Sequence, residues 1–305
     1  MIESLFSALP FGDIQKKPTL ISGGCSHVTY RVETDQGVYA AKALNKAVLD
    51  FLGGIELFKR RDELLALMIE TGFPSVSAVH IDEKIAIYPW REGRLLSLDQ
   101  ICDQHSKHIA RLLVKVHQRP VTELNLPLAP WQWLPRTDWG ELFADKALVS
   151  RLKTYESLYR QSWEGLSGQE VLSHGDLNYT NVLWSDENDP CVLDWESMGV
   201  AYPKAELISN AMGWSGYAID NFNSKLYQTM LAEYQQSSGA DLQLTEADFY
   251  ASWGYWLIWL VFCQKRVLGL MSCSPDQKAF YQTSVQKTLC LMDRLSCAPL
   301  NMLLA

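Results

Sequence analysis

The feature that most constrains the fold of this chain is a change in its sequence pattern near residue 90. Between residues 18 and 88, short runs of β-type residues alternate with turns that contain Gly, Asp and Ser. After residue 90, apolar residues recur mostly at helical spacing. We therefore predict an α+β protein with a small antiparallel-sheet lobe, residues 1–90, and a large, mainly helical lobe, residues 91–305.

The small lobe is predicted to contain one helix beside its strands. Strand signals within residues 18–44 predict three antiparallel strands, and two more short strands are expected at 76–79 and 85–88. The apolar spacing of residues 57–69 predicts the helix.

The composition disfavours several classes of partner. The chain has 305 residues, 48% of them hydrophobic, and is long enough for two cores. Its 27 basic and 35 acidic residues give a net charge of −8, which argues against a nucleic acid or an anionic membrane as partner. A local basic pocket for one phosphorylated small molecule remains compatible with this charge. The most apolar window, residues 253–262, is about half as long as a membrane span and predicts a buried helix.

The cysteines and the N-terminal residues predict a cytoplasmic location. Seven cysteines are an odd number, and no pair has C-x-x-C spacing, so the sequence suggests neither a disulfide framework nor a zinc site. The first residues lack the basic stretch of a secretory signal. The sequence leaves open whether the protein is a monomer or a dimer.

The densest polar cluster runs from Ser173 to Asn181 and is followed by Asp194-Trp195-Glu196. Two β-type runs, 181–184 and 191–195, flank a polar turn and predict a hairpin between these motifs. Asp176, Asn181 and Asp194 supply two carboxylates and an amide, and such hard oxygen ligands suit Mg²⁺.

Phosphoryl transfer needs these same groups. A carboxylate accepts the proton of the attacking hydroxyl, and oxygen ligands hold the metal on the nucleotide phosphates. A lone D-x-x-x-x-N spacing is usually an ordinary loop, so the prediction depends on H-G-D-x-x-x-x-N and D-W-E occurring together.

Two weaker signals lie upstream. Gly23 and Gly24 lie between predicted strands, where they form either an ordinary hairpin turn or a loop that approaches phosphates. Lys42 interrupts an apolar strand and is either a solvent-facing edge lysine or a phosphate contact. The sequence contains no G-x-x-x-x-G-K-[ST] motif, which excludes a P-loop NTPase.

Together these motifs resemble the aminoglycoside phosphotransferase and choline kinase superfamily, over roughly residues 18–215. The resemblance implies a protein-kinase-like bilobal fold and a reaction that uses ATP and Mg²⁺. It implies Asp176 as the catalytic base and Asn181 and Asp194 as Mg²⁺ ligands. The nucleotide-binding residues that it implies are Gly23, Gly24, Lys42, and the hinge residues Tyr88 and Trp90.

The chain departs from the family pattern in three places. His27 stands where many members carry Asn, and Glu206 stands for the Asp of a P-x-x-D element. A gap-free register puts Arg61 at the position of the helix glutamate that pairs with the lysine. We choose the nearby Glu63 as that partner, with Glu56 as the alternative.

The aromatic residues of the late chain suggest the acceptor. Trp214 and Tyr217 follow the metal motif, and Trp253, Trp256 and Trp259 recur at a spacing of three. Such a stripe is either core packing or an aromatic wall for a cationic or heteroaromatic ligand. The second interpretation, with Trp214, Tyr217, Trp253 and Trp256 as substrate residues, favours a small-molecule alcohol of the choline or thiamine type.

Other functions remain as alternatives. An aminoglycoside acceptor would favour more carboxylates than the late chain has, and a sugar or amino alcohol is a further possibility. A protein kinase should carry an A-P-E element after Asp194, which is absent. An inactive binding module should have lost one of four residues, all of which are present: Lys42, Asp176, Asn181 and Asp194.

Overall fold

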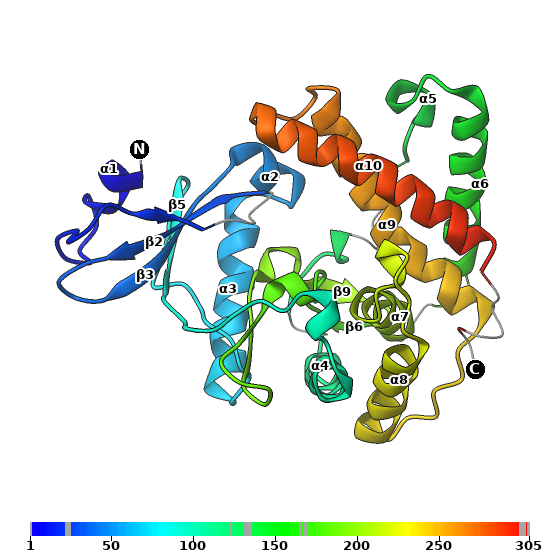
Figure 1. Ribbon diagram of the computed structural model, residues 1–305, viewed down its shortest axis with the longest axis horizontal. Coiled ribbons are helices and arrows are strands. Elements are labelled where there is room, and N and C mark those ends of the chain that lie inside the picture. The colour runs from blue at the N-terminus through cyan, green and yellow to red at the C-terminus, as the bar shows by residue number, and fades with distance from the viewer. Residues whose placement is uncertain are drawn as a thin grey trace. The chain divides into compact units, whose positions relative to one another are not determined.

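The computed structural model describes residues 2–21, 26–121, 124–130, 136–164, 166, 170–298 and 303. The chain divides into two compact units (Figure 1). The first comprises Met1–Arg94 with Leu183–Glu196, and the second comprises Leu95–Val182 with Ser197–Ala305. The predicted lobes were contiguous, whereas the first unit also takes a segment from the middle of the chain. The α+β prediction is confirmed.

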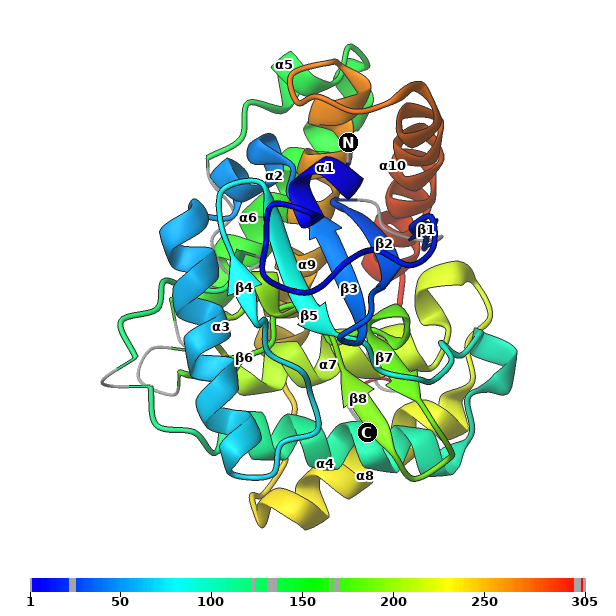
Figure 2. The ribbon, with the colours of Figure 1, turned by 90° about the vertical axis from the view of Figure 1, so that its left-hand side faces the viewer.

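The first unit is built on a five-stranded antiparallel sheet with the order β1-β2-β3-β5-β4 (Figure 2). The strands are β1 (Thr19–Leu20), β2 (Val28–Glu33), β3 (Val38–Ala43), β4 (His80–Ile81) and β5 (Ile85–Pro89). The strand predicted at 76–79 is absent. Its residues lead into β4, and Val79 donates its N–H to the carbonyl of Ile87.

Side chains of β5 alternate between the two faces of the sheet, as the period of a strand requires. Ile85 and Ile87 pack on one face with helix α1 (Ile2–Phe6). Ala86 packs on the other face with Leu49 and Phe58, which come from helices α2 (Lys46–Phe51) and α3 (Ile55–Glu70). Lys42 pairs with Ala86 in the sheet register and so lies on the second face. Helix α3 confirms the helix predicted at 57–69.

The middle segment of the first unit carries the predicted hairpin, β7 (Val182–Trp184) paired with β8 (Pro190–Val192). Ser75 bridges to Val192, and the indole of Trp195 lies against Phe73 with 5.3 Å between ring centroids. These contacts bring Asp194 and Glu196 into the same unit as Lys42.

The second unit is mainly helical, and its long helix α9 buries some of the late aromatic residues, including Phe249 and Trp253. Helix α9 (Glu246–Val267) packs against α6, α7 and α10. The other elements are η1 (Leu98–Gln100), α4 (Asp103–His117), α5 (Trp139–Leu142), α6 (Lys146–Trp163), β6 (Val171–Ser173), η3 (Tyr179–Asn181), η4 (Trp195–Ser197, which crosses the boundary), β9 (Gly199–Ala201), α7 (Pro203–Trp214), η5 (Tyr217–Ile219), α8 (Ser224–Ser238) and α10 (Pro275–Ser296). None of the helices in the described ranges is long and apolar enough to span a membrane.

Candidate active site

The loop that carries Asp176 is held in shape by local hydrogen bonds. It begins where β6 ends, and Gly175 has φ +80°. A Cβ at this glycine would lie 2.1 Å from the carbonyl oxygen of Ser197, so a side chain here would collide with backbone. The Gly175 N–H donates to Ser173 Oγ at 2.9 Å, and the Asp176 N–H donates to His174 Nδ1 at 3.1 Å. The glycine of the H-G-D motif is therefore required by the backbone conformation of the loop, in addition to the chemical role predicted for the aspartate.

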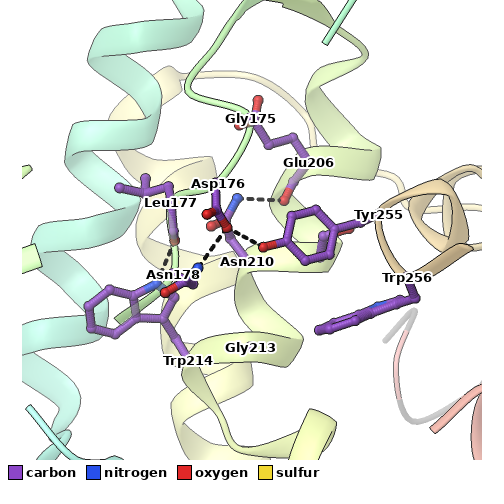
Figure 3. A pocket seen from close by; sticks show the side chains of 11 residues that line it. Gly175, Asp176, Leu177, Asn178, Glu206, Asn210, Gly213, Trp214, Tyr255 and Trp256 are labelled. Atoms are coloured by element: carbon purple, nitrogen blue, oxygen red, sulfur yellow. Dashed lines mark hydrogen bonds between the residues drawn. The ribbon is translucent and has the colours of Figure 1, made fainter. Parts of the chain in front are cut away.

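The carboxylate of Asp176 accepts hydrogen bonds on both of its oxygens. Oδ1 accepts from Asn178 Nδ2 at 2.6 Å and from the hydroxyl of Tyr255, a residue of α9 (Figure 3). Oδ2 accepts from Asn181 Nδ2 at 2.9 Å. Burial and the neighbouring carboxylate raise the pKa of Tyr255, so its hydroxyl stays protonated and donates.

Asn181 is oriented by the same loop. Its Nδ2 also donates to the carbonyl of Asp176 at 2.9 Å. Because these bonds use the amide nitrogen, the carbonyl oxygen Oδ1 is the atom that Asn181 can offer to a cation. This arrangement fits a magnesium ligand, since Mg²⁺ prefers oxygen donors.

In the first unit, Lys42 lies between two carboxylates. Its Nζ is 2.6 Å from Asp194 Oδ1 and 3.3 Å from Glu196 Oε2. Burial alone would lower the pKa of Lys42, but attraction to Asp194 and Glu196 outweighs it and raises that pKa. Lys42 is therefore a permanent cation that offsets the two acids.

The two carboxylates respond differently to this environment. Burial and repulsion from Glu196 raise the pKa of Asp194, although Lys42 opposes the shift. Burial would also raise the pKa of Glu196, but Lys42 and His27 prevail and lower it. His27 Nε2 lies 3.1 Å from Glu196 Oε2, and its Nδ1 accepts the Asn45 N–H at 2.9 Å. Glu196 is thus the firmly ionised member of the cluster.

The partner assigned to Lys42 needs correction. Glu63 pairs with Arg60 at 3.3 Å and its side chain is 65% exposed, and Glu56 pairs with Lys59. Arg61 points inward instead, donates to the carbonyl of Leu52 at 2.9 Å, and has its pKa lowered to about 10 by burial. Glu196, the last residue of D-W-E, takes the place expected of a helix acid. Its position two residues after the metal-motif aspartate was the only signal in the sequence.

The two predicted hinge residues lie at the end of β5 and are half-buried. Tyr88 packs with the cluster around Phe58, and burial raises its pKa. The indole of Trp90 donates to Glu92 at 2.8 Å, and the guanidinium of Arg31 lies 5.2 Å above its ring. Gly23 and Gly24 lie outside the described residues.

A pocket adjoins Asp176 in the second unit (Figure 3). Its volume, including its open mouth, is about 370 Å³. Trp214, Tyr255 and Trp256 supply its aromatic surface, and the Trp214 indole donates to the carbonyl of Leu177 at 2.9 Å. The remaining lining residues are Gly175, Asp176, Leu177, Asn178, Glu206, Ser209, Asn210 and Gly213.

Only two of the four predicted substrate residues, Trp214 and Trp256, line this pocket. Trp253 is fully buried and packs on Tyr155 and Phe249 in the core, so its assignment to a substrate wall is corrected. Tyr217 packs on Phe222 instead, with 5.1 Å between ring centroids.

The expected indole stripe is therefore not one surface. Trp259 stacks on Phe262, while Trp256 meets the ring of Tyr255. Residues three apart on a helix step about 60° around its axis, so the three indoles diverge. Tyr255 was not among the predicted substrate residues, and only its neighbour Trp256 could have suggested it.

Glu206 also lines the pocket, and it belongs to a buried network. Its Oε2 lies 2.9 Å from His117 Nε2, and His117 Nδ1 lies 2.7 Å from the hydroxyl of Tyr234. The other carboxylate oxygen of Glu206, Oε1, is buried and has no hydrogen-bond partner among the described residues. This network joins the ends of α4, α7 and α8 behind the pocket.

Comparison with known families identifies the class of the protein. The model of the phosphotransferase enzyme family, APH, matches residues 17–243. The chain belongs to this family. It is a small-molecule phosphotransferase, which confirms the enzyme class and the superfamily inferred from the motifs.

Solved structures show the same bilobal kinase-like fold in proteins of low sequence identity. A spectinomycin phosphotransferase in complex with ADP and spectinomycin has a TM-score of 0.68 and 14% identity, covering 97% of this chain and 98% of its own. A microcompartment-associated aminopropanol kinase has a TM-score of 0.68 and 15% identity, covering 98% of each chain. An ethanolamine kinase of Plasmodium vivax has a TM-score of 0.64 and 14% identity, covering 93% of this chain and 82% of its own. A search of curated protein sequences gave no match for this phosphotransferase.

Proposed function

We propose that this phosphotransferase transfers the γ-phosphate of ATP to the hydroxyl of a small cationic alcohol, with Asp176 as the catalytic base. One observation carries the proposal: the oriented carboxylate of Asp176 lines a pocket to which Trp214, Tyr255 and Trp256 contribute aromatic surface. An acceptor alcohol bound there would place its hydroxyl beside a proton-accepting oxygen.

In the proposed reaction, the acceptor oxygen forms a bond to the γ-phosphorus and the bond to the β-phosphate oxygen of ATP breaks. The hydroxyl proton passes to the carboxylate of Asp176. Lys42 contacts the nucleotide phosphates, and Glu196 keeps its ammonium in place. Asn181 Oδ1 and the carboxylate of Asp194 would hold Mg²⁺, which neutralises negative charge on the phosphates when it is bound.

The pocket favours a cationic acceptor. Faces of Trp and Tyr attract cations by roughly 0.5–2 kcal/mol per ring, and Asp176 and Glu206 add negative charge. The space for an acceptor is small, because the volume of about 370 Å³ includes open solvent at the mouth of the pocket. A compact amino alcohol, choline or a thiamine-type alcohol satisfies both conditions. The fold shared with aminopropanol and ethanolamine kinases supports this choice.

An antibiotic acceptor is the second candidate, because the fold is equally similar to that of a spectinomycin phosphotransferase. The two candidates separate in one experiment. Purified protein is incubated with ATP, Mg²⁺ and a panel of choline, ethanolamine, aminopropanol, thiamine, neutral sugars and aminoglycosides, and ADP formation is measured. We expect turnover with the small cationic alcohols. Turnover confined to sugars would reject the aromatic-pocket argument, and turnover confined to aminoglycosides would establish the alternative.

We also propose that the protein acts in the cytoplasm. The described cysteines include five free thiols, which suit a reducing compartment: Cys102, Cys191, Cys273, Cys290 and Cys297. Fractionation of cells that express the tagged protein tests this location.

A further inference from the structure

Tyr255 reaches the catalytic loop from a distant part of the chain. Asn178 and Asn181, which also donate to the carboxylate of Asp176, belong to the loop itself. Tyr255 lies 79 residues away in sequence, on α9. Its hydroxyl therefore ties the orientation of the carboxylate to a helix outside the loop.

Packing of α9 and a contact with Trp256 restrict the position of the Tyr255 ring. Helix α9 packs against other helices, among them α6, α7 and α10. The ring meets the indole of Trp256 edge to face, with 4.9 Å between centroids, and both residues line the pocket (Figure 3). The same helix thus supplies an aromatic wall of the pocket and a hydrogen bond to the carboxylate.

We propose that Tyr255 is a positioning residue that aims the carboxylate of Asp176 at the acceptor hydroxyl. The proposal rests on the proposed function, because it takes Asp176 as the base. Asn178 donates to the same oxygen as Tyr255, so the loop and α9 together restrict rotation of the carboxylate. The described donors to the carboxylate include a phenol and two side-chain amides.

The same contact suggests an alternative role for the Tyr255 hydroxyl. In that role it occupies the place of the acceptor hydroxyl and must leave when the acceptor binds. The packing favours positioning. To leave, the ring would have to move out of the pocket wall and give up its contact with Trp256. A positioning bond can instead persist while the acceptor binds.

The test compares Tyr255→Phe with Tyr250→Phe. Tyr250 is on the same helix, but its hydroxyl donates to Glu246 at 3.1 Å, and Tyr250 does not line the pocket. We expect Tyr255→Phe to lower kcat about tenfold or more, as expected for loss of a hydrogen bond to a charged group, with the KM for ATP unchanged. Tyr250→Phe should stay within about twofold of the wild type in both constants.

Three results would overturn the proposal. The first is an unchanged kcat in Tyr255→Phe, and the second is a higher kcat/KM for the acceptor, which would show that the hydroxyl competes with substrate. The third comes from crystal structures of the wild type and Tyr255→Phe. We expect the Asp176 carboxylate to rotate or to become mixed in orientation in the variant, and an unmoved carboxylate contradicts positioning.

The proposed function fails separately from this inference. It fails if no alcohol in the panel is phosphorylated, or if Asp176→Asn retains the wild-type kcat. The crystallographic comparison does not need an acceptor, so it decides the role of Tyr255 in that case as well.

Discussion

The cluster around Lys42 and the cluster around Asp176 differ in the charge of the groups that contact their carboxylates. In the first unit, two carboxylates, Asp194 and Glu196, are balanced by the ammonium of Lys42. In the second unit, Asp176 is oriented by the amides of Asn178 and Asn181 and by the phenol of Tyr255. Attraction to Lys42 opposes the rise in the pKa of Asp194 and, together with His27, lowers the pKa of Glu196, the residue that anchors the lysine. Hydrogen bonds from neutral donors fix the direction of the Asp176 carboxylate, which suits its proposed role as proton acceptor.

The largest effect is expected when the oriented base is removed. Asp176→Asn keeps the shape of the side chain but removes the proton acceptor, so kcat should fall about 10²- to 10⁴-fold while the KM for ATP changes little. Steady-state kinetics with the best acceptor of the panel measures both constants. Asp186→Asn, in the exposed hairpin turn, is the control and should behave as the wild type. Equal losses in the two variants would contradict a catalytic role for Asp176.

A smaller effect is expected when the charge-balanced cluster is altered. Glu196→Gln leaves Lys42 with one carboxylate, Asp194, and frees the ammonium to move. We expect the KM for ATP to rise about tenfold, in keeping with the worth of a charge-assisted hydrogen bond. ATP titrations measure the change, and Glu63→Gln is the matched control because its side chain pairs only with surface Arg60. If Glu63→Gln has the larger effect, the helix acid is the partner after all.

The smallest effect is expected at the aromatic wall. Trp256→Leu keeps an apolar side chain but removes a π face, so the KM for choline should rise about 3- to 30-fold, which corresponds to one cation–π contact. The neutral isostere 3,3-dimethyl-1-butanol should lose much less. Parallel titrations of the two alcohols separate the effect of the positive charge of choline from the effect of its shape. An equal loss for both would show that Trp256 acts through packing alone.

The sequence predicted the local part of the site well. Several hydrogen bonds of the H-G-D-x-x-x-x-N segment close within nine residues, from Ser173 to Asn181, and Gly175 meets the backbone requirement of that turn. Short-range geometry of this kind follows from residue type and spacing. Alternation along β5 likewise fixed which side chains of the small sheet meet α1 and which meet α3.

Long-range partners could not be predicted in the same way. Lys42 finds Glu196 at a separation of 154 residues, because the hairpin packs into the first unit and Arg61 is turned inward on α3. Glu63 and Glu56, the two acids of α3 considered as partners of Lys42, remain at the surface. The partner of Lys42 was predicted wrongly for a physical reason. Which charges pair depends on which elements pack together, and sequence spacing does not specify that packing.

The aromatic residues show the same division. Their number and their place in the late chain were evident from the sequence, and so was the buried character of the helix around Trp253. Which indole meets the pocket was decided by the rotation of α9 against α6, α7 and α10.

The sequence alone thus determined the family and the class of reaction, and it predicted which side chains of the H-G-D-x-x-x-x-N segment lie together, because these depend on side-chain type at short spacing. Tertiary structure alone decided the partner of Lys42, the donor Tyr255 on Asp176, and the split of the tryptophans between core and pocket. Each of these depends on burial and contact between segments far apart in the chain, where packing outweighs local preference.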